Sequence, residues 1–107
     1  MKIKTVDEER ILFDNGMEIT FDHEQDCCEC NYADFESLDT IVRETEFDEN
    51  LAFEVIEDAG FRFGNLPQKM FFVPCYSEQN GYYSTDIDIY FNQERVLGLC
   101  CQEKFEW

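Results

Sequence analysis

The residues best suited to chemistry in this chain lie in one short segment, residues 23–30. The segment combines one imidazole, three thiols and three carboxylates in the order His23-Glu24-Gln25-Asp26-Cys27-Cys28-Glu29-Cys30. Thiolates and imidazoles are the usual protein ligands of zinc, and a thiolate activated by a histidine is a nucleophile. Two kinds of site follow from these residue types, a metal site and a thiol active site.

A zinc site needs four ligands in a tetrahedron, usually supplied as two Cys-x₂₋₄-Cys or His-type pairs. The chain has only one Cys-x-x-Cys sequence, from Cys27 to Cys30, and its C-terminal cysteine pair is far from this cluster in sequence. The ligand set that the spacing allows comprises His23, Cys28, Cys30, Cys100 and Cys101. The alternative is that several of these cysteines are small buried apolar residues, the commonest state of cysteine outside disulfides.

A thiol enzyme would use His23 to deprotonate Cys27 or Cys28, with Asp22 or Asp26 orienting the imidazole ring. The surrounding carboxylates oppose this chemistry, because negative charge raises a thiol pKa and disfavours the thiolate. The sequence near the cluster also has no glycine-rich segment for an oxyanion hole. We therefore assign no catalytic residue and expect His23 to be a hydrogen-bonded residue at the end of a strand.

The elements that must position this cluster begin with a β-hairpin. Residues 11–13 and 17–23 alternate between apolar and polar side chains, which is the period of a strand. Asn15-Gly16 between them predicts a type I′ turn, since both residues tolerate positive φ. This register places Met17, Ile19, Phe21 and His23 on the buried face of the second strand.

The rest of the chain is dominated by the same period of two. We expect a short helix capped by Ser37 and strands over 51–56, 61–63, 69–76, 82–91 and 95–101. Pro74 places its strand at a sheet edge or a strand end, because proline has no N–H to donate. The sequence predicts a single α+β domain over residues 1–107. It consists mainly of an antiparallel sheet of about six or seven strands, with one or two short helices.

Charge limits the partners of this domain. Eight Lys and Arg oppose 25 Asp and Glu, a net charge of −17. Direct binding to nucleic acid is not expected, because the acidic domain repels phosphates. A basic protein partner is expected instead. The polar face of the strand over 82–91 carries Tyr82, Asp86, Asp88 and Tyr90, which form the candidate interaction surface. The alternative is a solvated acidic surface that maintains solubility.

Location is predicted from the chain's first residues and its cysteines. The chain opens without an apolar signal segment, and no run of about 18 apolar residues could cross a membrane. We therefore predict a cytoplasmic protein whose six cysteines stay reduced and which has no membrane partner.

Two motifs in order resemble those of an uncharacterised family of small phage and bacterial proteins. The first is His23-x-Gln25-Asp26-Cys27-Cys28-Glu29 after an Asn-Gly hairpin, and the second is Gln79-Asn80-Gly81-Tyr82-Tyr83-Ser84. In that family the second motif begins with Ser, where this chain has Gln79. The resemblance spans most of residues 11–91 and implies a phage or mobile-element origin. It carries no assigned activity and no catalytic residue.

These observations rank three functions for the chain. The first is a non-enzymatic acidic interaction protein that binds a basic protein partner and needs no cofactor. The second is a small metal-binding domain that holds zinc through the His/Cys cluster. The third is a thiol-dependent enzyme.

Overall fold

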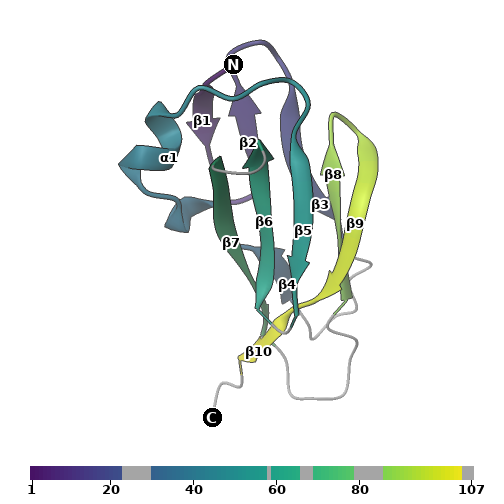
Figure 1. Ribbon diagram of the computed structural model, residues 1–107. Helices are drawn as coiled ribbons and strands as arrows, with labels where there is room; N and C mark the ends of the chain where they lie inside the picture. Colours follow the sequence, from purple (N-terminus) through teal and green to yellow (C-terminus); the bar gives the residue numbers. More distant parts are fainter. Residues whose placement is uncertain (23–29, 58, 66–68, 79–85, 105–107) are drawn as a thin grey trace.

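Alternating apolar residues build two β-sheets that pack face to face (Figure 1). The computed structural model describes residues 1–22, 30–57, 59–65, 69–78 and 86–104. Sheet A has the strand order β1 (Ile3–Val6), β2 (Arg10–Phe13), β3 (Glu18–Asp22), β8 (Asp86–Phe91) and β9 (Glu94–Cys100). Sheet B has the order β10 (Gln102–Lys104), β7 (Lys69–Glu78), β6 (Gly60–Asn65) and β5 (Ala52–Ile56), with β4 (Cys30–Ala33) also paired to β7. Apart from the parallel pair β10–β7, these strands pair antiparallel, and the predicted α+β, mainly antiparallel class is confirmed. The described residues contain more strands than the six or seven predicted.

The predicted first hairpin is present as β2 and β3, with Ile11 opposite Ile19. Its turn differs from the type I′ prediction. Gly16 has a φ of 90°, but Asn15 does not have a positive φ, and the Gly16 N–H donates to the Phe13 carbonyl at 3.1 Å. This is a type I turn followed by a left-handed glycine, the usual three-residue hairpin loop.

The connection between β4 and β5 contains a 3₁₀ turn, η1 (Phe35–Ser37), and one short helix, α1 (Thr40–Glu44). Ser37 is not the helix cap that the sequence predicted. Asp39 is the N-cap, and its side chain accepts a hydrogen bond from the Val42 N–H at 3.2 Å. No helix in the described ranges has the length and apolar character that a membrane crossing requires.

Strand β7 is the longest strand described, and among the described strands its first half, which contains Pro74, has a single partner, as the predicted edge position requires. Its first half pairs with β6, and its second half lies between β4 and β10. Pro74 lies where the partners change, since Ala33 of β4 pairs with the next residue, Cys75. The missing N–H of Pro74 therefore falls at a junction between ladders, where it is tolerated.

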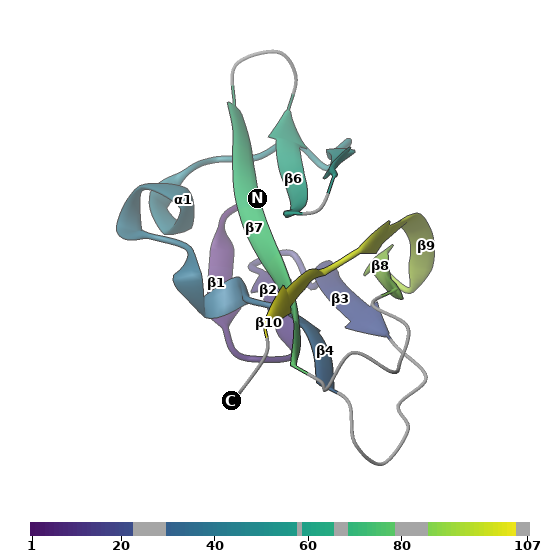
Figure 2. The same cartoon turned by 90° about the horizontal axis from the view of Figure 1, so that it is seen from below.

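Strand β9 passes directly from sheet A into sheet B. Cys100 ends β9, Gln102 begins β10, and Cys101 alone separates them. Seen from below, this segment crosses from the side of β8 to the side of β7 (Figure 2). The crossing brings the last residues of β9 next to the second half of β7.

The core lies between the sheets and is rich in phenylalanine. Sheet A contributes Phe13 and Ile89 among others, and sheet B contributes Phe61 and Phe63, all of them fully buried. Phe47, from the irregular segment after α1, is also buried, and its ring lies within 6.0 Å of the rings of Phe13, Phe63 and Phe71. The packed rings fix the distance between the two sheets, and they thereby also fix the position of the outer face of sheet A.

Candidate acidic interface

Three aspartates and a tyrosine share the outer face of sheet A. Ile87 and Ile89 of β8 are buried, so the alternate residues Asp86, Asp88 and Tyr90 face outward. On β3, buried Ile19 sets the same alternation and turns Thr20 and Asp22 outward. The register pairs Asp22 with Asp88 and Thr20 with Tyr90. We name the set Asp22, Asp86, Asp88 and Tyr90 the acidic face.

Charge on the acidic face is only partly neutralised. Asp22 and Asp88 lie directly opposite each other on paired strands, and like charges in that position repel. The Arg95 Nε donates to Asp88 Oδ1 at 2.9 Å. Gly98 leaves the space for this contact, since a Cβ there would lie 2.5 Å from Arg95 Nη2. The ion pair is exposed, so it contributes at most about 1 kcal/mol and leaves the face acidic.

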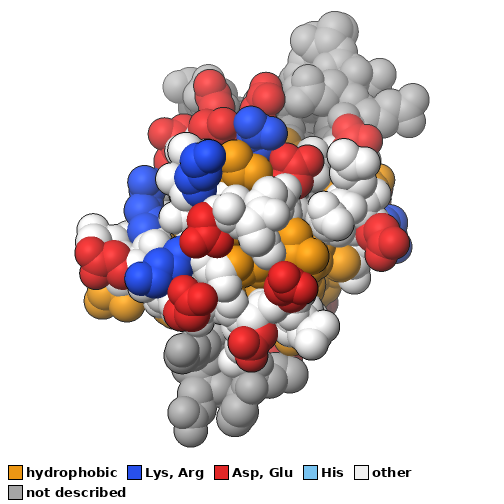
Figure 3. All heavy atoms as spheres, turned by 90° about the horizontal axis from the view of Figure 1, so that it is seen from above, with side chains coloured by type: hydrophobic (Ala, Val, Ile, Leu, Met, Phe, Trp, Pro, Cys, Tyr) orange, Lys and Arg blue, Asp and Glu red, His pale blue; other side chains and the backbone are white. Residues whose placement is uncertain are grey.

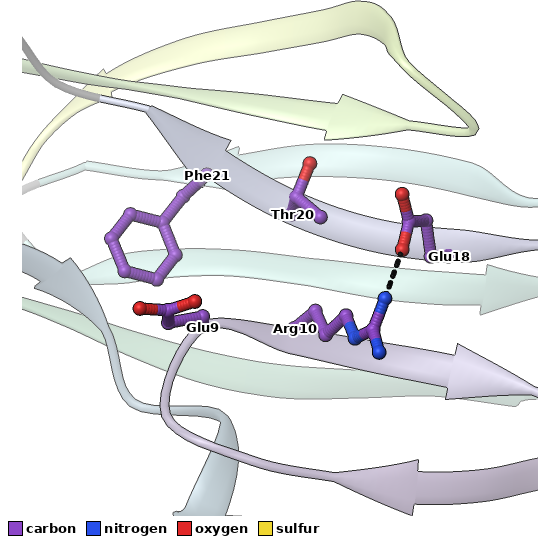
Figure 4. Close-up of a pocket in the computed structure, with 5 residues that line it drawn as sticks. All are labelled: Glu9, Arg10, Glu18, Thr20 and Phe21. Carbon is purple, nitrogen blue, oxygen red and sulfur yellow. Dashed lines mark hydrogen bonds and ion pairs between the residues drawn. The ribbon is translucent and has the colours of Figure 1, made fainter.

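A hollow of about 400 Å³ adjoins the acidic face beside Thr20. Its lining comprises Glu9, Arg10, Glu18, Thr20 and Phe21 (Figure 4). Arg10 pairs with Glu18 at 3.1 Å, while the Glu9 carboxylate lies next to the ring of Phe21. A carboxylate beside an aromatic ring suits a basic side chain, which both groups attract. Sequence reasoning did not find the hollow, because it depends on where β2 begins beside β3.

Elsewhere the surface charge is mixed. The end of the molecule seen from above shows Lys and Arg side chains interspersed among acidic ones (Figure 3). The ion pair Arg62–Glu54 is a further example of a neutralised acid. The acidic face differs because two of its aspartates, Asp22 and Asp88, lie directly opposite each other on paired strands.

The structure separates the two thiols of the C-terminal cysteine pair. Cys100 is exposed, and its Sγ donates to Asp86 Oδ1 at 3.2 Å. Cys101 is 4% exposed and lies near the thiol of Cys75 in the core. Neighbouring residues of an extended chain point to opposite sides, so these two thiols do not converge on one ion.

The other predicted site residues are placed only in part. Cys30 begins β4 opposite Glu78, and the structure describes its backbone alone. His23, Cys28 and Tyr82 lie outside the described residues. Within the described ranges, no three His, Cys, Asp or Glu side chains are grouped as a metal site requires. The zinc site stays a prediction.

A buried polar pair, which the sequence reasoning missed, joins three strands near the acidic face. Asn31 of β4 and Ser77 of β7 are both fully buried, and the Ser77 hydroxyl donates to Asn31 Oδ1 at 2.5 Å. The Asn31 amide nitrogen donates to the carbonyl of Asp86 at 3.2 Å. Buried polar groups that are hydrogen-bonded rigidify their surroundings, so this pair fixes the first residue of β8. An asparagine within a short strand was the only signal of it.

The Cys75 thiol gives the fold a pH dependence in the alkaline range. The hydrogen bond with Cys101 and burial raise the pKa of Cys75 well above its ordinary value of 9.0. Below pH 9 the thiol is protonated in both states. Above pH 9 the unfolded chain loses this proton while the folded chain keeps it, so the stability that the neutral thiol contributes is lost as pH rises.

We expect this loss to appear as a difference between the native protein and Cys75→Ala. The free energy of unfolding of the native protein should fall relative to the variant by about 1.4 kcal/mol between pH 8 and pH 10. Urea titrations at pH 7, 8, 9 and 10 measure both curves, and other titrating groups cancel in the difference. A constant difference across this range would contradict the assignment.

A family model described as a domain of unknown function (DUF7448) matches residues 1–89, which extend from the first strand into β8. Searches of the curated proteins and of the solved structures find no match to the chain.

Proposed function

Because the chain belongs to the family described as a domain of unknown function (DUF7448), whose description names no activity, we propose its function from the site itself. The protein is a non-enzymatic acidic interaction protein, and the acidic face binds a basic protein partner. The observation that carries this proposal is the direct pairing of Asp22 with Asp88, with Asp86 on the same face.

Electrostatics supports a cationic partner. Opposed carboxylates on paired strands cost the free protein about 0.2–1 kcal/mol, and a partner's Lys or Arg side chains would remove that cost on binding. The net charge of −17 would also attract a basic protein over a longer range and accelerate its association.

The surface beside the aspartates supports a protein partner over a lone cation. Tyr90 is half-buried next to Thr20 and Arg95, and tyrosine is enriched at protein interfaces. The hollow beside Thr20 extends the face and offers Glu9 and Phe21 to one basic side chain. The family resemblance implied by the sequence motifs gives no competing activity.

The test is binding of a fluorescent deca-lysine peptide, measured by anisotropy at 50 and 500 mM NaCl. Three exposed carboxylates at about 0.5 kcal/mol each predict that Asp22→Asn/Asp86→Asn/Asp88→Asn binds roughly tenfold more weakly at 50 mM NaCl. Raising the NaCl concentration from 50 to 500 mM should weaken binding of the peptide to the native protein at least roughly tenfold.

A second triple variant removes the same charge elsewhere. Glu36, Glu44 and Glu57 are exposed on η1, on α1 and after β5. Their replacement by glutamine should weaken binding no more than about twofold, through net charge alone. Equal losses in the two variants, or binding that is insensitive to salt, would show that the acidic face is not the interface.

A further inference from the structure

Two buried thiols meet where β9 crosses between the sheets. Cys75 of β7 is fully buried, Cys101 is 4% exposed, and the Cys101 thiol is close enough to raise the pKa of Cys75. Cys75 belongs to β7 and Cys101 lies between β9 and β10, 26 positions later in the sequence. Cys100, the third cysteine whose side chain the structure describes, instead faces Asp86 on the surface.

The strand register gives these thiols the geometry of a disulfide. Gln102 of β10 pairs in parallel with Tyr76 of β7, so the preceding residues Cys101 and Cys75 lie side by side. Neighbouring strands are about 4.8 Å apart, within the Cα separation of about 4.4–6.8 Å that disulfides span. Both side chains are buried, so both thiols lie on the core side of the crossing.

We propose that Cys75 and Cys101 form a reversible intramolecular disulfide that joins β7 covalently to the β9–β10 crossing. The oxidant is a small disulfide of the glutathione class. This inference is independent of the proposed function, since neither thiol lies on the acidic face.

The chemistry is two successive thiol–disulfide exchanges. Local opening of the β9–β10 crossing exposes both thiols. The Cys101 thiolate attacks one sulfur of oxidised glutathione and releases the first glutathione thiolate. Cys75, which loses its proton in the open form as it does in the unfolded chain, then attacks the Cys101 sulfur of the mixed disulfide as a thiolate and releases the second glutathione thiolate. Two protein thiols are oxidised, one small disulfide is reduced to two thiols, and the two protons pass to the released thiolates.

The bond would close a loop that contains β8 and β9. These strands carry Asp86, Asp88, Tyr90 and Arg95, so oxidation would fix the framework of the acidic face without touching its side chains. Reduction by a dithiol would break the disulfide, so that β7 and the β9–β10 crossing would again be joined without a covalent bond.

The test uses Cys100→Ser, because Cys100 and Cys101 fall in the same tryptic peptide. The folded variant is incubated with oxidised glutathione at pH 8.5, remaining thiols are alkylated under denaturing conditions, and tryptic peptides are analysed by mass spectrometry without reduction. We expect a cross-link between peptide 70–95 and peptide 96–104, and a higher urea midpoint of unfolding that returns to its starting value with dithiothreitol.

Matched variants decide the assignment. Cys101→Ser, with Cys100 retained, should give no cross-link between these two peptides, and Cys75→Ser should give none either. The proposal is overturned if Cys100→Ser yields only glutathione adducts or alkylated Cys75 and Cys101. A cross-link that persists in Cys101→Ser would overturn it too, since it would assign the bond to Cys100.

Discussion

Replacing Phe47 by alanine should destabilise the protein by about 3–5 kcal/mol, the cost of removing a fully packed aromatic ring. Phe47 is 1% exposed, and its ring contacts those of Phe13, Phe63 and Phe71 from both sheets. Its backbone also exchanges hydrogen bonds with Met1, at 2.7 and 2.6 Å. Urea denaturation measures the loss, which is a large fraction of the roughly 5–15 kcal/mol that stabilises a domain.

Phe72→Ala is the control for this experiment. Phe72 lies on the outer face of β7 and is 44% exposed, so its removal leaves no internal cavity. The loss should stay below about 1 kcal/mol, as for most surface substitutions. Comparable losses in the two variants would mean that Phe47 does not join the two sheets.

Gly60→Ala should be as damaging, for a different reason. Gly60 begins β6, and a Cβ there would lie 2.1 Å from the Val73 carbonyl oxygen and 2.9 Å from the Cys75 nitrogen. Both atoms belong to the backbone of β7, so the strand would have to move away. We expect a loss of about 3 kcal/mol or more, at the upper end of overpacking effects, together with weakened pairing between β6 and β7.

Gly16→Ala separates this steric effect from the backbone effect of losing glycine. Gly16 has a φ of 90°, and a Cβ there would meet no atom within 4 Å. Only the strain of a left-handed alanine applies, about 1–2 kcal/mol. Hydrogen exchange should report faster opening of the β6–β7 amides in Gly60→Ala alone. A smaller loss for Gly60→Ala than for Gly16→Ala would contradict the close approach of β6 to β7.

The strands with strict alternation were predictable because burial of one face imposes a period of two. This period placed Met17, Ile19 and Phe21 on the buried face of the second strand; Ile19 is fully buried, and Met17 and Phe21 are partly buried against the core. Turn chemistry was harder to predict. The type I′ geometry expected at Asn15-Gly16 occurs at Asn92 and Gln93 instead, where φ is 51° and 71°. The tight β8–β9 register imposes it there despite the absence of glycine.

Features that depend on residues distant in sequence were not predictable in the same way. Phe47 lies in an irregular segment, so no periodicity marked it as a core residue. Pro74 indicated a sheet edge, but not that β7 gains new partners from the next residue onward. Both outcomes depend on where β4 and β1 lie in the folded chain.

The residues of the candidate site also divide into those that a local pattern predicts and those that it does not. Asp86, Asp88 and Tyr90 were chosen from the face of one strand, and the structure places them together on the outer face of sheet A. Asp22 and the hollow beside Thr20 join them only through the pairing of β3 with β8, which no local pattern encodes. The ligand set of the zinc prediction included two adjacent cysteines, whose divergence follows from the extended backbone alone.

The pairing of β3 with β8 also sets the order in which the chain can fold. Ile19 pairs with Phe91, whereas the β2–β3, β5–β6 and β8–β9 hairpins each close a short loop. Loop closure costs more entropy as the loop lengthens, so the hairpins can form early and the β3–β8 ladder must wait for a rare long-range encounter. We therefore expect folding on the millisecond-to-second scale typical of non-local β topologies, with β3–β8 pairing as the slow step. The acidic face would then be among the last surfaces to form, because its two strands meet in that step.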